Sequence, residues 1–91
     1  MLTLPIKKKW FDMIKSGEKK EEYREIKRYY DVRLGNSKRF TTIIFRNGYL
    51  TESPKIKCNV EITIGYGKEE WGAEPNKAYY VLKILSVEEM K

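Results

Sequence analysis

The feature that most limits the fold of this chain is a ten-residue alternation of apolar and polar side chains. The apolar positions of KIKCNVEITI, residues 55–64, are Ile56, Cys58, Val60, Ile62 and Ile64. Successive side chains of a strand point to opposite faces, so this pattern predicts a strand with one buried face. It also places Cys58 in the core, where apolar surroundings raise the pKa of a thiol and favour a structural cysteine over a reactive one.

The remaining segments predict further strands and two short helices. Strand-like composition occurs in residues 1–6, 20–26, 40–49 and 78–87, and helical spacing of apolar residues occurs in 8–16 and 27–34. Gly17 and Gly35 stand where helices commonly end, and Asn47-Gly48 is a turn signal. We therefore expect an α+β fold, a small mixed β-barrel or partly closed sheet of five to six strands with two short helices.

Length and composition exclude several classes of protein. The 91 residues fit one domain, 1–91. The single cysteine allows no internal disulfide, and because the chain has no histidine, a Cys/His metal site and a histidine-based catalytic triad are excluded. We expect no metal and no cofactor. The sequence has no apolar run of about 18 residues and no secretory signal, so we expect a cytoplasmic protein without a membrane partner.

The positive charge is concentrated in the first half of the chain. The formal net charge is +6; residues 1–46 carry 13 Lys/Arg against 6 Asp/Glu, a net +7, and residues 47–91 carry 6 against 7, a net −1. A basic half of this kind indicates a polyanionic partner, because cations placed near phosphates gain affinity through counterion release. The alternative is a lysine-rich surface that only keeps the protein in solution.

The segment 20–26, KEEYREI, is unusual because it predicts a strand with no apolar face. Lys20, Glu22 and Arg24 would lie on one face of the strand. Glu21, Tyr23 and Glu25 would lie on the other. If the sheet closes on itself, one charged face points inward, and Glu22 and Arg24 can neutralise each other across the i, i+2 spacing. Lys19 or Lys20 would then lie at the lip of a cavity. The alternative is an edge strand whose charges prevent aggregation.

The order of motifs in residues 1–24 resembles a known family. A strand, WF-x-x-I, x-G-x-K and x-x-E-x-R follow one another in LTLPIKKKWFDMIKSGEKKEEYR. This order is similar to the signature of ASCH domains, members of the PUA-like superfamily. EIKRYYDVRL, FRNGY, GYGKEEWGAEP and YYVLKI resemble later segments of the small phage and bacterial members, so the resemblance covers nearly the whole chain.

The resemblance implies a compact barrel plugged by helices, with a cleft beside the Gly-x-Lys-x-x-Glu-x-Arg stretch that binds RNA or a nucleotide. One ASCH protein is an amidohydrolase that deacetylates N4-acetylcytidine with a lysine, a threonine and a glutamate, and another cuts single-stranded RNA. By position, Lys19 matches the catalytic lysine and Glu22 replaces the threonine. The KEEWG loop offers Glu69 or Glu70 as the glutamate, so the catalytic candidates are Lys19, Glu22 and Glu70.

Three hypotheses follow, and we prefer a binding module for single-stranded RNA or a modified nucleotide. Its candidate contacts are Lys19, Lys20, Glu22, Arg24, Lys27, Arg28, Arg33 and Trp71, with Tyr49 and Tyr66 as further aromatic candidates for stacking on an unpaired base. The second hypothesis is a hydrolase acting on a modified nucleoside, or a ribonuclease. The third is a phage-type inhibitor of a host nuclease or defence factor that uses the basic helix 27–34.

Overall fold

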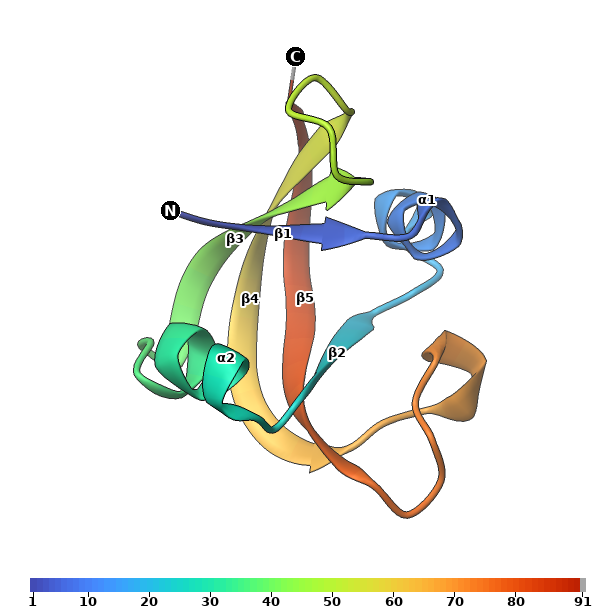
Figure 1. Ribbon diagram of the computed structural model, residues 1–91. Coiled ribbons are helices and arrows are strands. Elements are labelled where there is room, and N and C mark those ends of the chain that lie inside the picture. Colours follow the sequence, from blue (N-terminus) through green and yellow to red (C-terminus); the bar gives the residue numbers. More distant parts are fainter. Residues whose placement is uncertain (91) are drawn as a thin grey trace.

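Five strands form one mixed sheet in the computed structural model, which describes residues 1–90. The strands are β1 (Leu2–Ile6), β2 (Glu21–Glu25), β3 (Phe40–Asn47), β4 (Lys55–Tyr66) and β5 (Ala78–Met90). Their order across the sheet is β1-β3-β4-β5-β2 (Figure 1). β1 pairs with β3 in parallel and every other pair is antiparallel, so β1 and β2 are the two edges.

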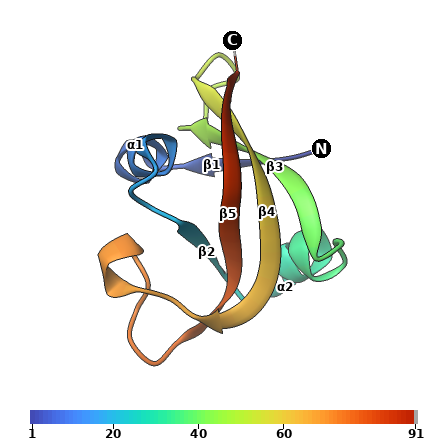
Figure 2. The ribbon, with the colours of Figure 1, turned by 180° about the vertical axis from the view of Figure 1, so that it is seen from behind.

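The sheet curls until its two edges approach each other. β4 and β5 pair along their whole length, and both bend strongly (Figure 2). The register between them shifts at Asn59/Val60, which leaves Leu85 of β5 as an extra residue; a bulge of this kind increases the local bend and twist of a strand. The side chain of Arg24 on β2 reaches β1, where Nη2 lies 2.9 Å from the carbonyl oxygen of Pro5. The result is a strongly curled half-barrel.

The inner face of this half-barrel holds the core. Ile56, Cys58 and Val60 of β4 are buried, as the alternating pattern predicts, but Ile62 is only partly buried and Ile64 is 64% exposed, because β4 continues beyond the core. The other fully or nearly fully buried apolar residues come from the remaining strands and the helical segments: Leu4, Phe11, Ile14, Leu34, Ile43, Phe45 and Leu82. The predicted α+β class and partly closed mixed sheet are confirmed.

The first helix, α1 (Lys8–Ser16), forms where the sequence predicts it. It buries Phe11 and Ile14 against the sheet. Gly17 ends the helix with φ +87°, a left-handed conformation that glycine adopts without a steric penalty, and its N–H donates to the carbonyl of Ile14. The chain then turns directly into β2.

The second helical segment differs from the prediction at its start. α2 (Arg28–Tyr30) is one short turn, and residues 31–35 continue it as a wider π-helical turn that ends at Gly35. The i, i+4, i+8 spacing of Ile26, Tyr30 and Leu34 in the sequence predicts that the three share one apolar face of this helix, but Ile26 is 44% exposed. Lys27 has extended backbone, so Ile26 lies before the helix, and only Leu34 is buried.

The ends of three strands also differ from the sequence prediction. β4 and β5 extend to Tyr66 and Met90, because the long hairpin keeps pairing beyond its buried section. β3 ends at Asn47, and residues 48–54 form a loop that carries the exposed Tyr49. Among residues 1–90, no helix has the length and apolar character needed to cross a membrane.

Candidate functional site

Strand β2 turns one charged face toward the inside of the half-barrel. Glu22 and Arg24 pair in register with Leu82 and Tyr80 of β5, which belong to the core. Residues that pair directly share a face, so both charged side chains point inward. The opposite face carries Tyr23, which is covered by the loop after β4: the position of a Cβ on Gly67 lies only 2.6 Å from Cζ of Tyr23.

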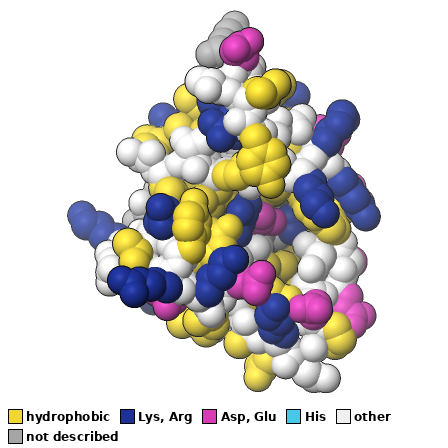
Figure 3. Space-filling view, in the orientation of Figure 1, with side chains coloured by type: hydrophobic (Ala, Val, Ile, Leu, Met, Phe, Trp, Pro, Cys, Tyr) yellow, Lys and Arg dark blue, Asp and Glu magenta, His cyan; other side chains and the backbone are white. Residues whose placement is uncertain are grey.

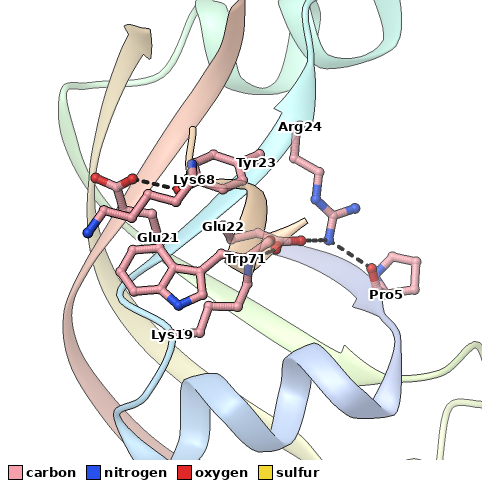
Figure 4. A network of polar contacts seen from close by, with 8 residues as sticks. All are labelled: Pro5, Lys19, Glu21, Glu22, Tyr23, Arg24, Lys68 and Trp71. Atoms are coloured by element: carbon pink, nitrogen blue, oxygen red, sulfur yellow. Dashed lines mark hydrogen bonds and ion pairs between the residues drawn. The ribbon is translucent and has the colours of Figure 1, made fainter. Parts of the chain in front are cut away.

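Glu22 and Arg24 form the centre of a polar network (Figure 4). Glu22 is 6% exposed, and its carboxylate accepts from Nη2 of Arg24 at 2.8 Å. The same guanidinium donates to the carbonyl of Pro5 on β1, and its Nη1 donates to the hydroxyl of Tyr30 at 3.1 Å. Arg24 therefore joins both edges of the sheet and the second helical segment. The predicted pairing of Glu22 with Arg24 is confirmed.

Lys19 lies beneath this pair and is 1% exposed. Its ammonium is 3.2 Å from Glu22 and donates to the carbonyl oxygen of Trp71 at 2.6 Å. The rings of Trp10 and Tyr23 lie 4.8 and 5.0 Å from Nζ, within the range of cation–π attraction. Burial lowers the pKa of Lys19, and the neighbouring Glu22 opposes that shift. The prediction that Lys19 lies at the lip of a cavity is wrong.

The loop between β4 and β5 covers Lys19. The backbone N–H of Lys68 donates to the Tyr23 hydroxyl at 2.9 Å, and that hydroxyl donates to Glu21 at 2.7 Å. Burial raises the pKa of Tyr23, which keeps its hydroxyl protonated. A 3-10 turn, Glu69–Trp71, then places the Trp71 carbonyl over the ammonium. The loop, although largely exposed itself, is thus held against β2 and shields the lysine from solvent.

A cavity of about 350 Å³ opens beside the Glu22–Arg24 pair, between the two helical segments. Its lining includes four aromatic residues, Trp10, Tyr23, Tyr30 and Tyr49. It also includes three lysines, Lys7, Lys8 and Lys27, and one acid outside the buried pair, Glu25, all exposed. Figure 3 shows dark blue basic side chains gathered over α1 and over α2, with hydrophobic side chains between them. The cavity combines an internally neutralised ion pair, aromatic walls and a basic rim.

The structure brings together some of the residues predicted for the site and separates others. Glu22, Arg24 and Lys27 line the cavity, and Lys19 contacts Glu22 from below. Those outside the lining are Lys20, Arg28, Arg33, Glu69, Glu70, Tyr66 and Trp71. Lys20, Glu69 and Glu70 are exposed, and Trp71 contributes its carbonyl to Lys19 while its ring lies 4.7 Å from the Lys68 ammonium.

Sequence reasoning missed Trp10 and Tyr30 as residues of the site. Both fit the apolar spacing of their helices, which assigns them to the core. In the structure each is only partly buried, whereas Phe11, Ile14 and Leu34 take the core positions. A usable signal is that each helix has more large apolar residues than one buried face can hold, so one aromatic per helix remains for the cavity.

No protein-family model, curated protein or solved structure matches this chain. Within residues 1–90, no group of three or more histidine, cysteine or carboxylate side chains is placed to hold a metal ion. The candidate site is therefore defined by its own geometry.

Proposed function

We propose that the cavity binds a nucleotide, either free or as an unpaired nucleotide of single-stranded RNA. The observation that carries this proposal is the buried Glu22–Arg24 pair beside a cavity with aromatic walls and a lysine rim. A purely structural ion pair has no need of aromatic side chains around a cavity of this size. The volume of about 350 Å³ lies within the usual range of sites for small molecules.

The floor of the cavity suits the edge of a nucleic-acid base. The Glu22 carboxylate has acceptor positions beyond its two ion-pair contacts, and a base offers N–H donors to them. Arg24 presents donors beside that carboxylate, and bases carry carbonyl or ring-nitrogen acceptors next to their donors. The floor thus offers acceptors and donors side by side, which matches a base edge better than a phosphate that can only accept, so we place the base at the floor.

The walls and the rim suit the rest of a nucleotide. Trp10, Tyr30 and Tyr49 offer rings for stacking, which is worth about 1 to 3 kcal/mol per base. Tyr49 is 84% exposed, so its ring can adjust to a ligand at the mouth. Lys7 and Lys27 offer cations to a phosphate at the rim.

The resemblance to ASCH domains supports the same proposal. Of the matching stretch, Glu22 and Arg24 line this cavity and Lys19 contacts Glu22 from below, and a curled mixed sheet with two short helical segments is the kind of fold that the resemblance implies. Under this proposal, Lys19 holds the Glu22 carboxylate and the covering loop in place and does not contact the ligand.

Isothermal titration with the four ribonucleoside 5′-monophosphates and with N4-acetylcytidine tests the proposal. We expect at least one of them to bind, and we expect Tyr49→Ser to weaken that binding about fivefold or more, because a surface for stacking is removed. Tyr66→Ser is the matched control, since Tyr66 is similarly exposed but lies outside the cavity. No binding of any of the five, or equal losses in both variants, would contradict the proposal.

Amidohydrolase activity is a second candidate, favoured by the lowered pKa of Lys19. Its weakness is access: the ammonium is buried under Trp71 and bonded to Glu22, so a substrate reaches it only if the loop moves. Single-turnover incubation with N4-acetylcytidine, followed by chromatography, tests this candidate. We expect no turnover; turnover by the native protein that Lys19→Ala abolishes would favour the enzyme instead.

A further inference from the structure

We infer that Tyr29 and Arg33, stacked beside the cavity, form a second subsite that takes the neighbouring nucleotide of the same strand. This inference rests on the proposed function and narrows its ligand from a free nucleotide to a single strand of at least two nucleotides. Neither residue lines the cavity. Both lie in the short helical segment next to it, Tyr29 in α2 and Arg33 in the π-helical turn that follows.

Arg33 and Tyr29 form a flat, preorganised surface. The guanidinium carbon of Arg33 lies 3.6 Å from the centroid of the Tyr29 ring. Its Nη1 donates to the backbone carbonyl of Tyr29 at 3.0 Å, which fixes the guanidinium over the ring. Arg33 is exposed and Tyr29 is 48% exposed, so the stack is accessible to solvent. Guanidinium and aromatic planes are the surfaces on which unpaired bases stack.

The stack is continuous with the wall of the cavity. The rings of Tyr29 and Tyr30 meet edge to face with centroids 4.8 Å apart. Tyr30 lines the cavity and accepts from Arg24 at its floor. A strand with one base in the cavity therefore passes Tyr30 and reaches Tyr29 with its next nucleotide. The two subsites are joined by one pair of neighbouring residues.

The charge around the stack suits the phosphate between two nucleotides. Residues 26–40 carry five Lys/Arg and a single acid, Asp31. Asp31 accepts from the Tyr80 hydroxyl at 2.6 Å, which ties it to the sheet. Arg39 pairs with Glu61, whereas Lys27, next to Tyr30, and Arg33 in the stack make no ion pair among residues 1–90. Unpaired cations beside a planar stack favour nucleic acid over an acidic protein segment, which supplies charge but no series of flat bases.

The test compares titrations of mononucleotides with titrations of the corresponding dinucleotides. The probes are the four ribonucleoside 5′-monophosphates and the four homodinucleotides, with the native protein and with Arg33→Gln, Tyr29→Leu and Arg28→Gln. Arg28→Gln is the matched control, because it removes the same charge from the same helical segment without touching the stack. We expect the native protein to bind a dinucleotide at least about fivefold more tightly than the mononucleotide.

Arg33→Gln and Tyr29→Leu are expected to remove most of that gain and to leave mononucleotide affinity unchanged. Arg28→Gln is expected to retain most of it. Equal affinity of the native protein for the two lengths, or equal losses in Arg33→Gln and Arg28→Gln, would overturn the second subsite while leaving the cavity proposal in place. Failure of both lengths to bind would overturn the cavity proposal itself, and the second subsite with it. Retention of an acidic peptide in place of the dinucleotides would identify a protein-binding surface and also overturn the inference.

Discussion

The ammonium of Lys19 is a buried charge, because the Lys19 side chain has no exposed surface. Its partners are the Glu22 carboxylate, the Trp71 carbonyl and the rings of Trp10 and Tyr23. A buried charge destabilises the folded state strongly when one member of its network is removed, because the remaining charges lose their partner. The contacts of Lys19 therefore hold the Glu22 carboxylate in place at the floor of the cavity.

Lys19→Met is expected to lower the free energy of unfolding by about 3 kcal/mol, because it leaves part of the Glu22 charge and the Trp71 carbonyl without a partner. Urea denaturation followed by tryptophan fluorescence measures this change. The control is Lys20→Met, a neighbouring lysine that is exposed, for which we expect a change within about 0.5 kcal/mol. Similar values for both variants would show that the buried network does not stabilise the fold.

Because the thiol of Cys58 is buried, we expect the folded protein to lose stability at alkaline pH. Burial raises its pKa from 9.0 to about 12. Between these values the unfolded chain releases the thiol proton and the folded chain keeps it, so stability falls as the pH rises, by up to about 1.4 kcal/mol per pH unit. Cys58→Ala is expected to lack this loss, and the difference between the two chains cancels the tyrosines, which titrate in both. Urea unfolding at pH 8 and pH 10.5 measures it.

The contradicting result is a stability difference between the native chain and Cys58→Ala that stays constant from pH 8 to pH 10.5. The same burial predicts that the native thiol is not modified by a thiol reagent until the protein unfolds. Rapid modification under native conditions would place Cys58 outside the core.

At the scale of elements, the loop after β4 fits tightly against β2. At Gly67 a Cβ would lie 2.7 Å from the Cβ of Ala73, and it would also collide with the ring of Tyr23. Gly67→Ala is therefore expected to displace the loop and lower the free energy of unfolding by about 1 to 3 kcal/mol. The control is Gly65→Ala in β4, where a Cβ meets nothing within 4 Å and stability stays equal or rises by up to about 1 kcal/mol.

Thermal unfolding of both variants by circular dichroism provides the measurement. If Gly67→Ala is as stable as Gly65→Ala, the loop does not pack against Tyr23 as described. A lowered stability of Gly67→Ala together with faster exchange of the Lys68 amide proton would locate the change in this loop, because that amide donates to the Tyr23 hydroxyl.

Elements with a local signal are predictable from the sequence. The alternation around Cys58, the end of α1 at Gly17 and the pairing of Glu22 with Arg24 all involve residues near one another in the chain, and the structure has all three. The burial of Lys19 depends on Trp71, which is 52 residues away, and the closure of the sheet depends on Pro5 and Arg24. No local sequence pattern indicates such long-range contacts. The groups that surround Lys19 and the walls of the cavity could therefore not be predicted from the sequence.

At the scale of the whole molecule, the curl of the sheet brings basic residues from separate segments to one opening. Lys7 and Lys8 precede or begin α1, and Lys27 precedes α2, yet all three line the same cavity. The net charge of +7 in residues 1–46 is thus partly gathered at the proposed binding site. Such a placement predicts binding that weakens with salt.

Replacing Lys7, Lys8 and Lys27 together with Gln is expected to flatten the dependence of log K on log salt for a single-stranded RNA. The slope changes by about 0.7 for each phosphate that the protein no longer neutralises, up to about 2 in total. The control replaces Lys57, Lys68 and Lys83, which removes the same number of charges away from the cavity. Fluorescence anisotropy at several salt concentrations measures both slopes, and equal flattening would indicate a diffuse surface effect.

The most direct test of the proposed site is an NMR titration of the ¹⁵N-labelled protein with the ribonucleoside 5′-monophosphates. The proposal predicts that the largest shifts fall on the indole N–H of Trp10, the side-chain N–H groups of Arg24 and the backbone amides of Tyr30 and Tyr49, which surround the cavity. Shifts centred instead on a different cavity of the protein, lined by Leu34, Ile62 and Ile64, or no shifts at millimolar nucleotide, would contradict it.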